Sequence, residues 1–269
     1  MGKSLTVIKY GGSAMTDVEK KRGFLEDIAK LKSCGENIVI VHGGGPEING
    51  MLKRVGKMSE FVEGNRVSDV ETVEIAEMVL SGKLNKSIVA QLNNCGVKAV
   101  GLSGKDGNMI TAKKKYLDID GKPVDIGFVG EVVSVDTELL TLLLENGYLP
   151  VISTIGKDDL GNTYNINADY VAGEIAGALG AERLLMFTDV DGVYMDFEDK
   201  GSLIPEISKG EVLSLIEKKI VSGGMLPKVK TCLDGLNKGV ERVVILNGKL
   251  ENIVDRYFSG ERVGTTIKN

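Results

Sequence analysis

The stretch "IVIVHGGGPEING" at residues 38–50 joins a run of β-branched residues directly to three glycines. The run at 38–41 predicts a strand buried on both faces, because parallel strands covered by helices are continuously apolar. The glycines at 43–45 bring no Cβ to the turn, so a ligand could approach the backbone N–H groups closely. Pro46 suits the first position of a helix, and a helix N-terminus attracts anions. The stretch therefore predicts a strand–turn–helix unit with an anion at the turn, although a tight turn without a ligand would leave the same pattern.

Composition limits the classes of protein that this chain can represent. With 269 residues, of which 42% are hydrophobic and 26% charged, it can form one large domain or two modest ones. The net charge of −5 argues against a nucleic-acid-binding surface. Three cysteines far apart in the sequence suit a reducing compartment and predict no disulfide. Because no apolar run approaches the length of about 20 residues that a membrane span needs, we expect a cytoplasmic protein with no membrane partner.

Strand-like and helical segments alternate along the chain, which predicts an α/β fold with a mainly parallel central sheet and helices on both faces. The predicted strands are 5–10, 37–41, 148–153, 183–188 and 242–247. The predicted helices are 17–34, 46–55, 69–80, 83–95, 136–146, 168–179, 209–217 and 225–238. The segment 106–132 is rich in glycine, aspartate and lysine and predicts hairpins at the edge of a site. We expect two lobes, 1–173 and 174–269, joined within one continuous fold.

A second glycine turn follows the first predicted strand. "IKYGGSA" places Lys9 inside the strand and Gly11 and Gly12 just after it. Ligands of open α/β sheets bind beyond the carboxyl ends of the strands, so two such turns on neighbouring strands could surround one anion. A lysine that only extends its ammonium group to water is the alternative interpretation of Lys9.

Three further segments carry polar residues that apolar periodicity does not explain. Arg66 in "FVEGNRVSD" could clamp a carboxylate, although a surface arginine would look the same. Asn165 and Asp169 lie at a predicted helix start, where N-capping accounts for Asn167 alone. Lys228 follows a pair of glycines and could equally be a solvated helix lysine.

Two common nucleotide-binding motifs are missing, since the chain has no GxxxxGK[ST] and "HGGGPE" lacks the last glycine of GxGxxG. His42 is the only histidine, so any mechanism that needs a histidine base must use this residue. We interpret His42 as a packing or hydrogen-bonding residue rather than a catalytic base.

Eight motifs together resemble the amino acid kinase family. They are "KYGGSA", "VIVHGGGPEIN", "GNRVSDVETVEIAEMVLSGKLNKSIV", "GLSGKDGNMI", "GYLPVIS", "NINAD", "FTDVDGVY" and "SGGMLPKV", in family order from about residue 5 to 267. The resemblance implies a three-layer αβα sandwich whose N-terminal lobe binds an acyl amino acid and whose C-terminal lobe binds ATP with Mg²⁺. The implied reaction is phosphorylation of the side-chain carboxylate of N-acetyl-L-glutamate, a step of arginine biosynthesis.

The resemblance also implies residue roles. Lys9 and Lys228 resemble the two lysines that neutralise the transferring phosphoryl group, and Asp169 the acid that orients them. Gly11 and Gly12 resemble phosphate-binding donors. The substrate-binding positions are Gly44, Gly45, Arg66 and Asn165. The nucleotide-binding positions are Asp189, Val190, Asp191, Gly192, Val193, Tyr194, Ile220, Val221 and Ser222. Mg²⁺ is expected on the nucleotide, with no ligand from a protein side chain.

This chain departs from the family pattern at Asn65 and Ser68, where the family often has "GLRVTD". The departure leaves open a substrate one methylene longer, such as an aminoadipate derivative, since a methylene gives only about 1–3 kcal/mol of discrimination. A catalytically silent binding or sensor protein of the same fold is the alternative from another class. We expect a homodimer without strong feedback by arginine. The first predicted strand leaves no room for the N-terminal helix that arginine-sensitive hexamers of the family carry. The C-terminal segment of such relatives commonly has a histidine and a glutamate where this chain places Glu251 and Arg256, so the resemblance implies that Arg256 would put like charge against an arginine effector.

Overall fold

The computed structural model describes residues 4–11 and 18–269, and its centre is an eight-stranded sheet in the order β12-β14-β13-β11-β1-β2-β8-β5. The strands are β1 (Leu5–Tyr10), β2 (Asn37–His42), β5 (Ala99–Ser103), β8 (Leu149–Ser153), β11 (Arg183–Thr188), β12 (Glu206–Ser208), β13 (Arg242–Asn247) and β14 (Thr265–Lys268). All neighbouring strands run parallel except β13 and β14. The predicted mainly parallel α/β sheet is therefore confirmed.

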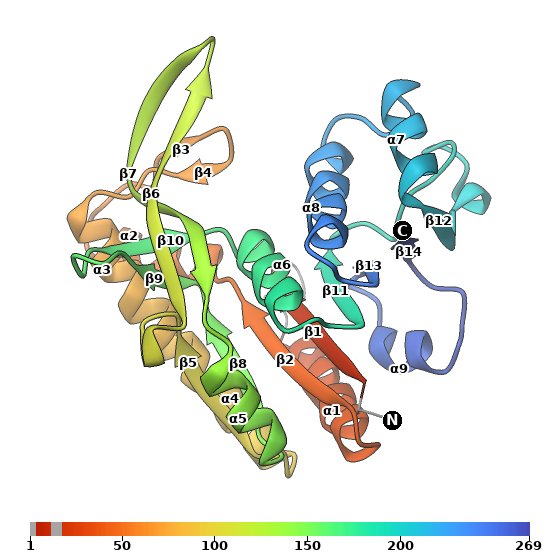
Figure 1. Ribbon diagram of the computed structural model, residues 1–269, viewed down its shortest axis with the longest axis horizontal. Helices are drawn as coiled ribbons and strands as arrows, with labels where there is room; N and C mark the ends of the chain where they lie inside the picture. Colours follow the sequence, from red (N-terminus) through yellow and green to blue (C-terminus); the bar gives the residue numbers. More distant parts are fainter. Residues whose placement is uncertain (1–3, 12–17) are drawn as a thin grey trace.

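Helices cover both faces of this sheet (Figure 1). One layer holds α1 (Val18–Ser33), α2 (Gly45–Arg54), α3 (Val70–Glu77), α4 (Asn85–Asn94) and α9 (Ile253–Phe258), which share one apolar cluster. The other holds α5 (Glu138–Glu145), α6 (Ala168–Ala178), α7 (Lys209–Glu217) and α8 (Met225–Asn237), which share a second cluster. Alternation along β1 sends Ile8 and Tyr10 to the first cluster and Val7 to the second. Lys9 therefore lies on the α6 side of the sheet.

The predicted helices 69–80 and 83–95 are joined in the structure. A π-helical segment, Met78–Leu84, connects α3 directly to α4, so one continuous helical stretch replaces the two separate helices predicted. Leu80 and Leu84 of this segment are buried in the same apolar cluster as α2. π-Helical turns inside α-helices are frequent at functional sites, and this one packs behind the glycine turn described below.

A smaller β-structure lies over the carboxyl edge of the sheet. The long hairpin of β6 (Ile110–Ile119) and β7 (Lys122–Val135) closes a four-stranded barrel with β9 (Ile155–Lys157) and β10 (Thr163–Ile166). It extends away from the helical layers beside the short hairpin of β3 (Phe61–Val62) and β4 (Asn65–Arg66) (Figure 1). Two 3₁₀ turns, Asp106–Asn108 and Lys200–Ser202, complete the described elements. The hairpins predicted within 106–132 are a single long hairpin in the structure, which runs from Ile110 to Val135.

Gly127 locks the β3–β4 segment onto the long hairpin. Ser68 donates its N–H to Ile126 O at 3.0 Å and accepts from the Phe128 N–H at 2.6 Å. Gly127 lies between them at φ +79°, and a Cβ there would be 2.2 Å from Ser68 O. The glycine is therefore required by both its backbone conformation and its close approach to Ser68.

We expect Gly127→Ala to lower the free energy of unfolding by about 2–3 kcal/mol, because the clash adds to the cost of a positive φ. Gly121→Ala is the matched control, since Gly121 also has positive φ (+76°) but open space around its Cβ position. That variant should lose only about 1 kcal/mol. Urea unfolding measures both, and equal losses would contradict the steric explanation.

The predicted lobe boundary near residue 173 falls within α6. The division into lobes 1–173 and 174–269 stays a prediction. Within residues 4–11 and 18–269, every helix is too short or too polar to cross a membrane.

Candidate active site

A cavity of about 340 Å³ opens at the carboxyl ends of β1 and β2. The α2 N-terminus, the β3–β4 hairpin and the β10–α6 junction form its walls. The predicted residues that line it are Lys9, Gly11, Gly44, Gly45, Arg66, Asn165 and Asp169. Gly12 lies outside the described residues. Residues from seven separate parts of the sequence thus line one site, as expected for the switch region of a parallel sheet.

Arg66 is buried in the wall of this cavity, with only 7% of its surface exposed. Its guanidinium donates to Asn49 Oδ1 at 2.6 Å, Ser59 Oγ at 2.8 Å and Gly45 O at 3.1 Å. Burial lowers the pKa of Arg66, and no carboxylate in the described part of the chain forms an ion pair with it. A buried guanidinium without an acidic partner favours binding of an anion.

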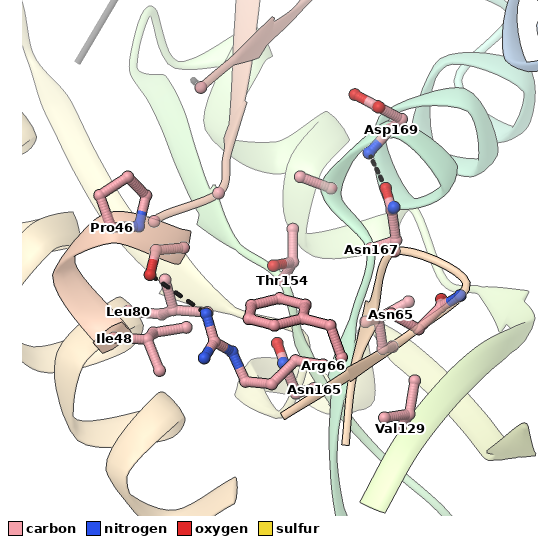
Figure 2. A pocket seen from close by; sticks show the side chains of 18 of the residues that line it. Pro46, Ile48, Asn65, Arg66, Leu80, Val129, Thr154, Asn165, Asn167 and Asp169 are labelled. Carbon is pink, nitrogen blue, oxygen red and sulfur yellow. Dashed lines mark hydrogen bonds between the residues drawn. The ribbon is translucent and has the colours of Figure 1, made fainter. Parts of the chain in front are cut away.

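Figure 2 shows Arg66 and Asn165 close together and Asp169 at the far end of the same cavity. Asn167 caps α6 by accepting the Asp169 N–H at 2.8 Å, so the expectation that capping uses Asn167 alone is confirmed. The Asp169 side chain instead forms an ion pair with Lys9, at 2.9 Å between Nζ and Oδ1. Lys9 Nζ also lies 3.4 Å from Phe187 O. These contacts with Asp169 and Phe187 O hold the Lys9 ammonium group in place.

A second cavity, of about 480 Å³, shares Lys9 and Asp169 with the first. Its other charged residues are Asp189, Lys228 and Lys249. Lys228 forms an ion pair with Asp189 and holds the pKa of that carboxyl below its usual range. Asp169 was expected to orient both lysines. In the structure Asp169 contacts Lys9, while Lys228 has its own carboxylate in Asp189.

The sequence of residues 4–247 matches the amino acid kinase family. The chain belongs to this family. Membership makes it a kinase, that is, a phosphotransferase enzyme, and agrees with the helix–sheet–helix layers described above.

Known proteins are similar to this chain over nearly its whole length. Acetylglutamate kinase of Methanococcus aeolicus is 50% identical over 266 residues, which cover 97% of this chain and 90% of that protein. N-acetylglutamate synthase from Neisseria gonorrhoeae, solved with coenzyme A and N-acetyl-glutamate, has a TM-score of 0.83 at 25% identity. The alignment covers 99% of this chain but 59% of the synthase. A Streptococcus mutans structure has a TM-score of 0.77 at 28% identity and covers 98% of both chains.

Most residues that the family resemblance assigns to the nucleotide do not line the second cavity of this kinase. Among residues 189–194 only Asp189 lines it. Asp191 instead accepts hydrogen bonds from Asn247 and Tyr194, each at 2.7 Å, which lowers the pKa of its carboxyl. These contacts shape the loop after β11 rather than the cavity wall. The other residues of the segment are Val190, which packs against the core, Gly192, and the buried Val193 and Tyr194.

The second predicted nucleotide segment also lies outside this cavity. Val221 is buried in the core, while Ile220 and Ser222 are exposed beyond the cavity wall. Their assignment to the nucleotide stays a prediction.

Lys249 is the charged residue of the second cavity that the sequence interpretation missed. It follows the last residue of β13, Asn247, which accepts the Lys249 N–H at 2.9 Å. A polar residue just beyond the carboxyl end of a buried parallel strand is the signal that identified Lys9 and Gly11. The same rule applied to "RVVILNGK" would have identified Lys249.

Proposed function

We propose that the chain transfers the γ-phosphoryl group of ATP to the side-chain carboxylate of N-acetyl-L-glutamate, giving N-acetyl-L-glutamyl 5-phosphate. The observation that carries the proposal is that two cavities with otherwise different lining residues share Lys9 and Asp169. Such an arrangement can hold two substrates with their reacting groups on either side of one ammonium group. The name of the Methanococcus relative supplies the acceptor and the reaction.

Arg66 and Asn165 are the proposed contacts of the acceptor amino acid. The guanidinium and the side-chain amide supply donors that suit an α-carboxylate and an acyl oxygen. Asn165 forms no side-chain hydrogen bond to another described residue, which leaves its amide available. The acceptor's reacting carboxylate then extends toward Gly44, Gly45 and Lys9.

Phosphoryl transfer to a carboxylate needs positive charge rather than a base. The acceptor is already ionised at neutral pH, so no side chain has to remove a proton. Lys9, Lys228 and the N–H groups at the start of α2 would reduce the repulsion between the two anions and stabilise the transition state. Asp169 and Asp189 each hold one of these lysines in place.

ATP is proposed to bind with its phosphates in the second cavity. The three lysines there fit a polyphosphate, and the two carboxylates are both ion-paired. Across residues 4–11 and 18–269, no three His, Cys, Asp or Glu side chains are grouped as metal ligands. We propose that Mg²⁺ is carried by the phosphates, whose negative charge it would neutralise when bound.

An assay of ADP release with hydroxylamine trapping of the product tests the proposal. Hydroxylamine converts an acyl phosphate into a hydroxamate and so separates carboxylate phosphorylation from simple ATP hydrolysis. The panel comprises N-acetyl-L-glutamate, glutamate, aspartate, carbamate, UMP and an N-acyl aminoadipate. We expect hydroxamate with N-acetyl-L-glutamate at the highest kcat/KM. A higher value for the aminoadipate derivative, or no hydroxamate at all, would contradict the proposal.

We further propose a cytoplasmic homodimer that responds weakly to arginine. Cys34, Cys95 and Cys232 are all unpaired, which suits a reducing compartment. Val70 and Met78 leave more than half of their surfaces exposed, about two helical turns apart, and such apolar exposure suits a subunit contact. Arg256 stands where arginine-sensitive relatives commonly have a glutamate, and it is paired with Glu261 at 2.8 Å from Nε to Oε2, so this position offers no carboxylate to an arginine effector.

Light scattering should therefore give a mass near twice the 28.8 kDa of the chain. Initial rates should change by less than about 2-fold at millimolar arginine, because position 256 carries a guanidinium in place of a carboxylate that could pair with the effector. A hexamer, or strong inhibition by arginine, would contradict this part of the proposal.

A further inference from the structure

The only histidine of the chain lies directly before the glycine turn of the active site, yet it is not exposed to the cavity. His42 ends β2 and is fully buried. Because Ile38 and Ile40 of the same strand pack into the α1–α4 layer, alternation places the imidazole on that side. The ring is therefore behind the glycine turn, while Gly43, Gly44 and Gly45 line the cavity in front.

Two hydrogen bonds define which ring nitrogen carries the proton. His42 Nδ1 lies 2.9 Å from Gly43 O, and a carbonyl can only accept, so Nδ1 must donate. His42 Nε2 lies 3.1 Å from Asn85 Nδ2, which can only donate. The orientation of the Asn85 amide is fixed independently, because its Nδ2 donates to Val151 O at 2.9 Å and its Oδ1 accepts from Lys86 Nζ at 3.1 Å. The ring is thus the neutral Nδ1–H tautomer, and burial lowers its pKa to about 4.

The bond from His42 orients one particular peptide group. The C=O of Gly43 and the N–H of Gly44 belong to the same trans peptide and point in opposite directions. With the carbonyl directed at the buried imidazole, the Gly44 N–H is directed toward the cavity. Within the described part of the chain, this N–H donates to no backbone carbonyl.

Packing behind the turn excludes a side chain at residue 44, so the hydrogen bond from His42 has to hold the 43–44 peptide in its orientation. A Cβ on Gly44 would lie 2.6 Å from Leu84 Cδ2 and 2.7 Å from Leu80 Cδ2, both in the π-helical segment. The position must therefore be glycine, and glycines on both sides of a peptide offer little resistance to its rotation. A rotated peptide would direct the Gly43 carbonyl oxygen at the bound anions.

We infer that His42 is a positioning residue, which holds the 43–44 peptide so that the Gly44 N–H donates to the oxygens of the transferring phosphoryl group. The inference rests on the proposed function, because the donor matters only if a phosphoryl group passes that point. The inference predicts that kcat depends on an N–H donor at the position of His42 Nδ1, while substrate binding changes much less without that donor.

His42→Gln and His42→Asn form a matched pair of variants. The asparagine amide can place a donor where Nδ1 lies, whereas the glutamine amide reaches the Nε2 position and leaves Gly43 O without a partner. We expect His42→Gln to lower kcat by about 10-fold or more and His42→Asn by less than about 5-fold. KM for ATP should stay within about 3-fold in both, and thermal unfolding reports how much each variant is destabilised. Equal losses of kcat would overturn the inference, because a packing role treats the two amides alike.

NMR of wild-type protein labelled with ¹⁵N-histidine gives a second test that needs no turnover. With a single histidine, both ring signals belong to His42, and the couplings of each nitrogen to the ring C–H protons distinguish Nδ1 from Nε2. A neutral Nδ1–H tautomer at pH 7 is expected, and an Nε2–H tautomer would overturn the inference whatever the substrate. If wild-type protein forms no hydroxamate but shows the Nδ1–H tautomer, the proposed function fails while the orientation of the 43–44 peptide is supported.

Discussion

Replacing Lys9 by alanine is expected to lower kcat by about 10² to 10³, the loss typical of removing one preorganised donor to a developing charge. Lys9 is the cation shared by both cavities, and its ammonium is already held by Asp169 and Phe187 O before substrates arrive. Steady-state kinetics with N-acetyl-L-glutamate and ATP should show a fall in kcat larger than the change in either KM. Lys228→Ala should behave similarly.

Asp169 gives this prediction a sharper form. Without Lys9, the Asp169 carboxylate would face the transferring phosphoryl group as an uncompensated negative charge. The double variant Lys9→Ala/Asp169→Asn should therefore lose less activity than the product of the two single losses. Lys113→Ala is the control, since Lys113 is an exposed lysine paired with Glu131 on the long hairpin. Near wild-type turnover by Lys9→Ala would remove Lys9 from the mechanism.

The central sheet could be predicted from sequence because its inner strands are continuously apolar. β1, β2, β11 and β13 are buried on both faces, and each ends in a polar residue or glycine that marks the carboxyl edge. The short strands β5, β12 and β14 were not predicted, since three to five residues carry too little periodicity. The pairing of β12 with β14 depends on the chain folding back over about 60 residues, which no local pattern records.

The site was predictable in its components but not in all of its pairings. Glycine turns and strand-end lysines are local signals, and these residues do meet around one pair of cavities. The partner of Lys228 is Asp189, 39 residues away, and several carboxylates satisfy the same rule of opposite charge. Likewise, nothing near His42 in the sequence indicates that Asn85 contacts its ring. These pairings depend on which face of each helix packs against which strand, and local sequence does not determine that packing.

Arg66→Lys is expected to lower kcat/KM for N-acetyl-L-glutamate by about 10²-fold, equivalent to about 2.7 kcal/mol, and to leave KM for ATP nearly unchanged. The guanidinium is planar and its donors already contact Asn49, Ser59 and Gly45, while its Cζ lies 4.8 Å from the Phe61 ring centroid. These contacts fix the remaining donor positions before a carboxylate binds. A lysine ammonium can reproduce neither the fork of donors nor the stacking, so it would bind the carboxylate as a mobile point charge.

The control for this last prediction is Arg54→Lys, which makes the same chemical change at an exposed arginine in the last turn of α2. It should leave both KM values within about 2-fold, because an exposed charge gains little from the shape of its head group. Arg66 lies at the end of the first cavity away from Asp169, so any effect on ATP would have to pass through the shared Lys9. An equal rise in KM for ATP and for the acyl amino acid would therefore place Arg66 outside the acceptor site. A selective rise for the acyl amino acid would assign the first cavity to the acceptor and leave the second to the nucleotide.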